Sequence, residues 1–544
     1  MKKAFGLLVL LLAVCELHGA AAPRTILVLP FENQSTRPDL NWISESFAEM
    51  LASRLSAADR YVLSRPERNA AYEQLDIPPG TPLTLASICK VAETLGVDWA
   101  VAGNFTVEGE RLTARAQLLD VRRLRLGSTL EATGELADLV DLQTRLAWRL
   151  LATQDAGFTV GAEEDFGRVF PEVRLDAFEN YIRGLLVTDA ESRVRFLREA
   201  DRLDPRDHRA ALELGRYYFD QKDYENSALW LRKLGPDDPN YLESLFLLGV
   251  DEFFLGHDAA AERAFVQLSA QIPLNEVWNN LGFMQARRGR AKEAVTNFER
   301  AYQGDPTDPV FCFNLGACLW YLKRYQEAAR YLEEAVRLAG DDPETHTLLA
   351  VVLGSLGNAE GEQREFRWLA EHEENSFSDA GPDLLPHLRL KKNYDGRAYR
   401  LLSLAVRSAL EKSLEGEPPE QRGEVHLARG KEFLAQGRLN EAERELRETV
   451  TLLLGASEAH LALAQVYEAQ GRRREAAAEL ETSLKLQNSV TAHLHLARVY
   501  LSLDQPEAAR EHSRAALSLE PDNHEAQELM DQIPRLAPAA GKKP

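Results

Sequence analysis

Four histidines recur at related positions, and imidazole is the side chain best suited to metal binding and proton transfer near neutral pH. Each stands four residues before a small residue, in the pairs His346–Ala350, His426–Gly430, His460–Ala464 and His493–Ala497. A metal site needs ligands that converge on one point. Histidines at equivalent positions of a repeating pattern lie in a row instead of converging. We therefore expect them to pack between helices, at the position where Trp278 stands in residues 275–306.

Motifs for catalysis and for cofactor binding are missing from the sequence. It contains no G-x-G-x-x-G, no G-x-x-x-x-G-K-[ST], no G-x-S-x-G and no C-x-x-C. The run His372-Glu373-Glu374 begins like a zinc-protease motif but lacks the second histidine. We therefore expect a protein that is not an enzyme and that has no catalytic residue, cofactor or metal.

The cysteines outside the amino-terminal leader are Cys89, Cys312 and Cys318. An odd and sparse set of this kind does not form a disulfide framework. Cys312 and Cys318 stand six residues apart on one predicted helix and therefore point to different sides. We expect them to act as small buried hydrophobic residues.

Aromatic, asparagine and arginine side chains gather on two neighbouring predicted helices. These are the residue types that form binding hot spots and that satisfy a peptide backbone. The candidate partner-binding residues, taken from the helical register, are Asn279, Asn280, Phe283, Arg287, Phe313, Asn314, Trp320 and Tyr321. Trp and Tyr are enriched at interfaces, which favours an exposed groove for Trp320 and Tyr321. A role in the core is equally consistent with Phe246 and Phe253.

A repeat of about 34 residues determines where these side chains lie. A small residue recurs with steps of 34, 33, 34 and 34 residues, and then, further along, with steps of 34 and 33; the positions are Gly215, Gly249, Gly282, Gly316, Ala350 and then Gly430, Ala464, Ala497. In residues 275–306, Gly282 and Ala294 are small enough for two antiparallel helices to approach closely. Pro306 ends that unit, because proline cannot continue a helix.

This pattern resembles the tetratricopeptide (TPR) repeat, a helix-turn-helix unit of 34 residues. The resemblance covers residues 174–371, with about six repeats of which the first is degenerate, and residues 424–533, with three repeats and a capping helix. It implies a solenoid whose concave groove binds other proteins or peptides. Residues 372–423 break the period and are predicted to be an irregular insertion or hinge with a helix near 397–414, and residues 534–544 a disordered tail.

Residues 23–155 lack this period and predict a small α/β domain. Strands are expected near 25–31, 60–64, 99–107, 112–120 and 124–132, and helices near 42–55, 86–95 and 136–151. The segments ILVLPFENQS, ISESFAEMLASRL and LGVDWAVAGNFTVEGERLTARAQLLD resemble the amino-terminal domain of TolB. That resemblance brings no catalytic residues, and related domains act at the bacterial cell envelope or in signalling proteins. The predicted fold class is thus α+β, with an α/β domain before an all-α TPR solenoid in two sub-arrays.

The first 22 residues have the order of a secretory signal peptide. Lys2 and Lys3 precede an apolar run at residues 6–14, and small residues follow at 19–22. We therefore expect export to the periplasm or cell envelope, with an uncleaved membrane anchor as the alternative. Cys15 follows a run similar to a bacterial lipoprotein box, although Val14 stands where a small residue is usual, so lipidation of Cys15 is a further alternative.

The formal net charge of −21 disfavours nucleic acid and anionic lipid as partners. The sequence thus predicts an exported, non-enzymatic scaffold that binds proteins through the concave groove, with membrane association only if Cys15 is lipidated. One alternative is a structural or assembly subunit of an envelope or secretion complex. Another is a sensory or regulatory input protein of a signalling pathway.

Overall fold

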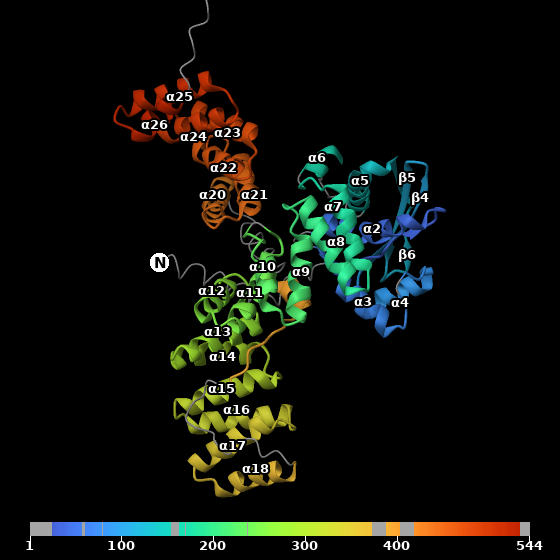
Figure 1. Cartoon of the computed structure of the whole chain (residues 1–544), viewed down its shortest axis with the longest axis vertical. Helices are drawn as coiled ribbons and strands as arrows, with labels where there is room; N and C mark the ends of the chain where they lie inside the picture. The colour runs from blue at the N-terminus through green and yellow to red at the C-terminus, as the bar shows by residue number, and fades with distance from the viewer. Residues whose placement is uncertain are drawn as a thin grey trace, which may run out of the picture. The chain divides into compact units, whose positions relative to one another are not determined.

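The computed structural model describes residues 24–56, 60–78, 80–153, 163–168, 170–236, 238–372, 388–402 and 418–533 (Figure 1). These residues form two compact units. The first takes the described residues up to Lys233 and from Glu243 to 402, and the second takes 234–242 and 418–533. The predicted signal peptide, Cys15 and the predicted tail lie outside the described residues, as does the stretch 403–414 of the helix predicted near 397–414.

A seven-stranded mixed sheet opens the first unit, with the order β3-β1-β4-β5-β6, β2 beside β4 and β7 beside β5. Its strands are β1 (Arg24–Val28), β2 (Glu32–Asn33), β3 (Arg60–Val62), β4 (Trp99–Glu108), β5 (Arg111–Asp120), β6 (Arg125–Leu126) and β7 (Leu130–Glu135). β1 runs parallel to β3 and β4, whereas β4 and β5 form an antiparallel hairpin in which Glu108 pairs with Arg111. The hairpin closes at the turn that the sequence predicts.

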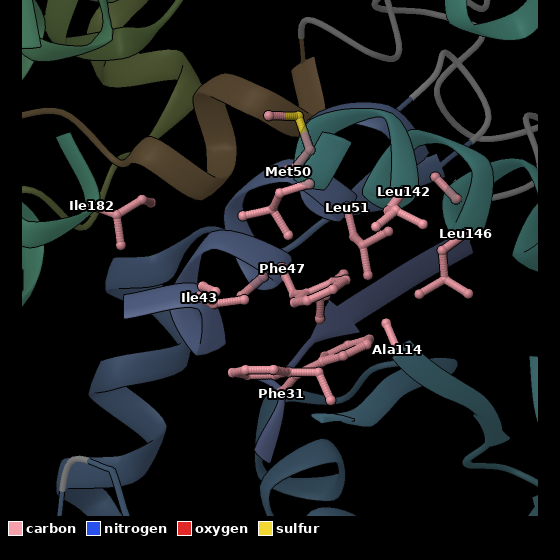
Figure 2. Packing of buried hydrophobic residues seen from close by; sticks show 14 of the residues in the cluster. Phe31, Ile43, Phe47, Met50, Leu51, Ala114, Leu142, Leu146 and Ile182 are labelled. Carbon is pink, nitrogen blue, oxygen red and sulfur yellow. The ribbon is translucent and has the colours of Figure 1, made fainter. Parts of the chain in front are cut away.

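Alternation along β1 places side chains in two cores, one on each face of the sheet. Ile26 and Val28 join a core with α2 (Trp42–Leu55) and α5 (Leu139–Ala152), whereas Leu27 and Leu29 join a core with α3 (Arg65–Gln74) and α4 (Leu85–Leu95). Figure 2 shows the first core, in which the rings of Phe31 and Phe47 stack with centroids 4.4 Å apart.

This first core continues from the sheet into the helical array. Phe178 and Ile182 of α7 (Leu175–Leu186) are fully buried in it, together with Leu197 of α8 (Ala190–Leu203). The α/β region and the first helix pair therefore share one hydrophobic core. A short helix, α6 (Glu163–Arg168), lies between α5 and α7 in the chain.

Helix pairs make up most of the rest of the described chain. In the first unit α7 and α8 are followed by α9 (Arg209–Asp220) with α10 (Tyr224–Leu231), α11 (Tyr241–Phe254) with α12 (Asp258–Ser269), α13 (Asn275–Arg287) with α14 (Ala291–Gly304), α15 (Pro309–Tyr321) with α16 (Tyr325–Leu338), and α17 (Pro343–Ser355) with α18 (Ala359–Glu371). The second unit contains α20 (Pro419–Ala435) with α21 (Leu439–Leu452), α22 (Ser457–Ala469) with α23 (Arg473–Leu486), α24 (Val490–Ser502) with α25 (Pro506–Leu519), and α26 (His524–Gln532). This architecture confirms the predicted α+β fold class.

The small residue of each first helix faces the second helix of its own pair. A Cβ added at Gly316 would lie 2.7 Å from the Leu332 side chain, and one added at Gly215 would lie 2.5 Å from Leu231. The partner stands 16 residues further along in both pairs. The predicted close approach of the helices is therefore confirmed, because an added Cβ at Gly316 or Gly215 would force the leucine of the neighbouring helix to move.

The repeated histidines also face the second helix of their pair. Nδ1 of His346 lies 2.6 Å from Glu365 Oε2, and Nδ1 of His460 lies 2.7 Å from Glu479 Oε2. His426 contacts Glu445 in the same way, and the corresponding contact of His493 is with His512. Each partner follows its histidine by 19 residues, so the predicted packing position between helices is confirmed.

Candidate functional site

The asparagines predicted to bind a partner lie together on α13 and α15. Asn279, Asn280 and Asn314 are fully buried, and Phe283 and Phe313 are buried as well. An extended segment of the same chain, residues 388–394, covers the asparagines (orange in Figure 1). The candidate groove is therefore occupied in this structure by a peptide that the chain itself supplies.

Two asparagines hold the main chain of this segment. The amide of Asn280 donates to the Lys391 carbonyl at 2.8 Å and accepts from the Lys391 N–H at 2.8 Å. Asn314 does the same with Arg389, at 2.7 Å to the carbonyl and 2.8 Å from the N–H. A side-chain amide offers one acceptor and a donor group side by side, as a peptide group does. Each asparagine therefore gives one residue of the segment the same pair of hydrogen bonds that a neighbouring β-strand would give.

Asn279 joins these two contacts into one network. Its Nδ2 donates to the Arg389 carbonyl at 3.0 Å and to Asn280 Oδ1 at 3.2 Å, and its Oδ1 accepts from Asn314 at 2.8 Å. Buried amides are costly to leave without hydrogen bonds. The bound main chain therefore satisfies polar groups that the helix bundle alone leaves open.

Acidic side chains at the helix N-termini hold the basic side chains of the segment. Arg389 pairs with Asp342 at 2.7 Å and with Glu344 at 2.9 Å, at the start of α17. Its guanidinium lies 3.8 Å from the centroid of the Phe313 ring, which adds a cation–π contact. Lys391 pairs with Asp308, the N-cap of α15.

The segment continues from the groove to the sheet. The ring of Tyr394 packs edge-on against Phe246 with centroids 4.8 Å apart, and burial together with the carboxylate of Glu243 raises the pKa of its hydroxyl well above the usual value. Residues 396–402 are helical. From this helix Arg400 reaches the α/β region, where it donates to the hydroxyl of Tyr61 at 3.1 Å.

Arg400 also enters a polar cluster at the start of α3. Its guanidinium lies 3.2 Å from the Ser64 hydroxyl and 2.9 Å from Glu67 Oε2. Burial, and then the hydrogen bond to Glu67, raise the pKa of Tyr61 to about 12. Burial opposes ionisation of Glu67, but hydrogen bonds from Tyr61 and Ser64 hold its pKa below the usual value. The carboxylate is therefore charged and pairs with Arg400.

The remaining candidates lie further along the same helices. Arg287 is half-buried near Phe253 and Phe283, with its guanidinium 5.2 Å and 6.0 Å from their ring centroids, and it pairs with Asp258. Trp320 is half-buried, and Tyr321 is 49% exposed. The contacts of the segment described above fall on neither of these two residues, so the structure gathers the asparagines and Phe313 around the peptide but leaves Trp320 and Tyr321 outside it.

Sequence reasoning missed the acidic half of the site and its occupant. Asp308, Asp342 and Glu344 were not among the candidates, although an aspartate at the N-cap of two successive first helices is visible in the sequence. The segment that fills the groove could also have been noticed in the sequence. The run LRLKK at 388–392 carries three basic residues in a chain whose net charge is −21.

Cys312 and Cys318 are buried free thiols, and burial raises the pKa of both to about 12, so neither is a nucleophile near neutral pH. No group of three or more His, Cys, Asp or Glu side chains is placed to hold a metal ion in this part of the chain. None of the helices described there has the length and apolar character needed to cross a bilayer.

Comparison with known families supports the repeat assignment. Family models described as tetratricopeptide repeat match residues 286–352, and also 175–241, 427–480 and 461–526. These parts of the chain are tetratricopeptide repeats, as the 34-residue period predicted. The α/β region that precedes them is present, and its resemblance to the TolB domain stays a prediction.

Individual proteins and solved structures are similar only over part of the chain. BBSome complex member BBS4 from Bos taurus is 24% identical over 183 residues, which are 34% of this chain and 35% of that protein. This chain thus spans about a third of that relative's length. A crystal structure of MamA protein is 15% identical, covering 32% of this chain and 96% of its own, with a TM-score of 0.29. A tetratricopeptide repeat protein from Parabacteroides merdae ATCC 43184 is 16% identical, covering 53% and 97%, with a TM-score of 0.24.

Proposed function

We propose that this protein is a non-enzymatic scaffold that binds other proteins through the groove formed by α11, α13, α15 and α17. The observation that carries the proposal is the pairing of Asn280 and Asn314 with the N–H and C=O of residues 391 and 389. Solenoids of stacked repeats generally use such surfaces for binding. The BBSome relative is by its name a member of a complex, which supports this reading.

The ligand of this groove is an extended polypeptide. In a helix the N–H and C=O of an inner residue are used within the helix itself, so they cannot both pair with one asparagine. An extended chain leaves both groups free, as recognition by strand addition requires. The geometry at Asn280 and Asn314 therefore favours an extended segment over a helix as the partner.

Export to the bacterial envelope belongs to the same proposal. It is supported by the signal-like order of residues 1–22 and by the TolB resemblance of the α/β region. Fractionation of the host cell tests it, with the protein expected in the periplasmic or envelope fraction. If Cys15 is lipidated, the protein is a membrane-associated assembly subunit, and Cys15→Ala then releases it from the membrane fraction.

The test of the scaffold function is a quantitative crosslinking pull-down from the host cell. It compares the wild type with Asn280→Ala/Asn314→Ala and with Trp320→Ala/Tyr321→Ala. We expect specific partners to be lost from the asparagine variant and kept by the aromatic variant, which changes the same helix outside the peptide contacts. A partner list that both variants leave unchanged contradicts binding in this groove and directs attention to the α/β region.

A further inference from the structure

We propose that residues 388–394 are an internal ligand, and that the external partner is an extended segment with basic residues two positions apart that displaces it. The inference rests on the proposed scaffold function and adds the chemistry of the partner and a control on access to the groove.

The spacing of the repeats matches the spacing of the peptide residues that they hold. Asn280 and Asn314 are 34 residues apart, one repeat, and they hold the main chain of residues 391 and 389, which are two apart. Asp308 and Asp342 are also 34 residues apart, and they pair with the side chains of the same two residues. Asn280 and Asp308, from two successive helix pairs, hold residue 391, and Asn314 and Asp342, one repeat further along, hold residue 389 in the same way.

The two basic side chains of the segment point to the same side of the groove. In an extended chain residues i and i+2 point to the same side, so Arg389 and Lys391 both face the helix N-termini where Asp308, Asp342 and Glu344 lie. Aromatic rings lie under both cations, with Phe313 at 3.8 Å from the guanidinium carbon and Phe311 at 5.2 Å from Nζ, measured to the ring centroids. The groove thus selects cations at two positions of the peptide that are two residues apart.

A separate peptide of the same chemistry can make the same contacts. Most of the contacts to residues 389 and 391 are made with their main chain or their positive charge, and neither depends on the rest of the sequence. The ion pairs lie at the rim of the groove, with side-chain exposure of 24% and 21% for Arg389 and Asp342. Ion pairs that water still reaches cost less to break than fully buried ones, so an external peptide can replace them.

Competition by a tethered ligand has a predictable size. A segment held in the same chain acts at an effective concentration of about 1 mM. If the free peptide has a dissociation constant of about 100 μM, the tethered copy weakens binding of an external competitor by about tenfold.

The experiment measures binding of a fluorescein-labelled peptide with the sequence of residues 388–396 by anisotropy. The proteins are the full chain, the opened variant Arg389→Glu/Lys391→Glu, and the matched variant Lys292→Glu/Arg397→Glu. The matched variant makes the same change of net charge at two exposed residues that take part in none of the contacts between the segment and the groove. We expect the opened variant to bind at least about tenfold more tightly than the other two. A peptide with glutamate at the positions of Arg389 and Lys391 should not bind.

Each result separates the inference from the scaffold function. Equal binding by all three proteins overturns the internal ligand but leaves a groove that binds peptides. Absence of binding to the opened variant overturns the basic partner, while the pull-down, which assumes no charge for the partner, still decides the scaffold function. Adding Asn280→Ala/Asn314→Ala to the opened variant should abolish binding. If charge reversal impairs folding, a Gly/Ser replacement of residues 388–394 serves as the opened protein.

Discussion

The three buried asparagines of the groove have a role that the helix bundle itself does not need. Asparagine is a poor residue for the interior of a helix, because its amide needs hydrogen-bond partners. Asn279, Asn280 and Asn314 find these partners in one another and in the main chain of residues 389 and 391. Their burial is therefore explained by recognition of a peptide backbone.

This role predicts the behaviour of two amide hydrogens. The N–H groups of Arg389 and Lys391 donate to Asn314 and Asn280, respectively. Replacing both asparagines by alanine should raise hydrogen exchange of residues 389 and 391 by about tenfold, since a lost hydrogen bond of about 1.4 kcal/mol corresponds to that factor. Mass-spectrometric exchange on this segment measures the effect. Asn393→Ala, at an exposed position of the same segment, should change nothing, and unchanged exchange in the double variant contradicts the assignment.

A histidine pair makes the second unit sensitive to acid. Nδ1 of His493 lies 3.0 Å from Nδ1 of His512. Burial lowers the pKa of both, and the neighbouring His512 lowers that of His493 further, while Glu511 and Glu481 oppose the shift at His512. Below pH 6.5, the ordinary pKa of histidine, the unfolded chain therefore binds more protons than the folded chain. The free energy of unfolding thus has its full value above that pH and falls as the pH drops through it.

Calorimetry at about pH 7.5 and 5.5 checks this dependence, on either side of the ordinary histidine pKa. We expect His493→Gln/His512→Gln to lose less stability between the two values than the wild type. His524→Gln changes an exposed histidine of the same unit and should keep the wild-type dependence. An equal loss in all three proteins would show that the pair does not cause the sensitivity.

At the scale of the helix pair, two fixed spacings along the sequence determine the packing. The small residue of the first helix contacts a large residue 16 positions later, as Gly316 contacts Leu332. The histidine contacts a residue 19 positions later, as His346 contacts Glu365. Both contacts join the two helices of one pair. They occur together in α20 and α21, where Gly430 approaches Leu446 and His426 contacts Glu445, whereas in α15 and α16 Cys312 stands at the histidine position.

The close approach makes two helical glycines respond differently to alanine. At Gly316 an added Cβ meets the branched part of Leu332 at 2.7 Å, whereas at Gly354 it meets the flexible end of Glu362. We expect Gly316→Ala to lower the free energy of unfolding by about 1–3 kcal/mol through overpacking. Gly354→Ala should be neutral or raise it by up to about 1 kcal/mol through helix propensity. Urea denaturation measures both, and equal effects would contradict the packing argument.

The elements follow well from the sequence wherever a period or a turn marks them. The 34-residue step predicts the helix pairs, and the turn at Gly109 predicts the hairpin of β4 and β5. Helix α3 (Arg65–Gln74) was not predicted, because its apolar pattern is weak. The capping box between Ser64 and Glu67 marks its start and is visible in the sequence.

The candidate site could be predicted less well from the sequence, because the segment that fills the groove is distant in sequence from the helices that form it. Register alone places Asn280 and Asn314 on the inner face, and the structure puts the peptide there. Interface statistics favoured Trp320 and Tyr321, which lie outside the peptide contacts. No local pattern reveals that residues 388–394 return to helices about 75 to 111 positions earlier in the chain. Only the basic run in an acidic chain hints at this contact.

At the scale of the first unit, one segment joins the groove to the sheet. Residues 388–394 lie on α13 and α15, and Arg400 pairs with Glu67 beside Tyr61. A partner that displaces the segment from the groove therefore also disturbs the ion pair and the hydrogen bonds of Arg400. The α/β region is in this way linked to the occupancy of the groove.

This link predicts an effect of a substitution far from the groove. Arg400→Ala removes an ion pair and two hydrogen bonds that hold the segment in place. It should therefore strengthen binding of the labelled 388–396 peptide by a few-fold, about 1 kcal/mol. Arg397→Ala changes an exposed arginine of the same short helix and should have no effect. Binding that Arg400→Ala leaves unchanged would show that the two contacts are independent.

The most direct test is hydrogen exchange, followed by NMR, of the ¹⁵N-labelled wild-type chain in an excess of the unlabelled 388–396 peptide, because the isotope separates the chain's own segment from the added peptide of the same sequence. The account predicts that the added peptide replaces the identical segment of the chain. Exchange of the chain's own residues 388–394 should then rise, while α13 and α15 keep their protection. Exchange in residues 388–394 that does not change at saturating peptide would contradict a groove whose occupant can be replaced.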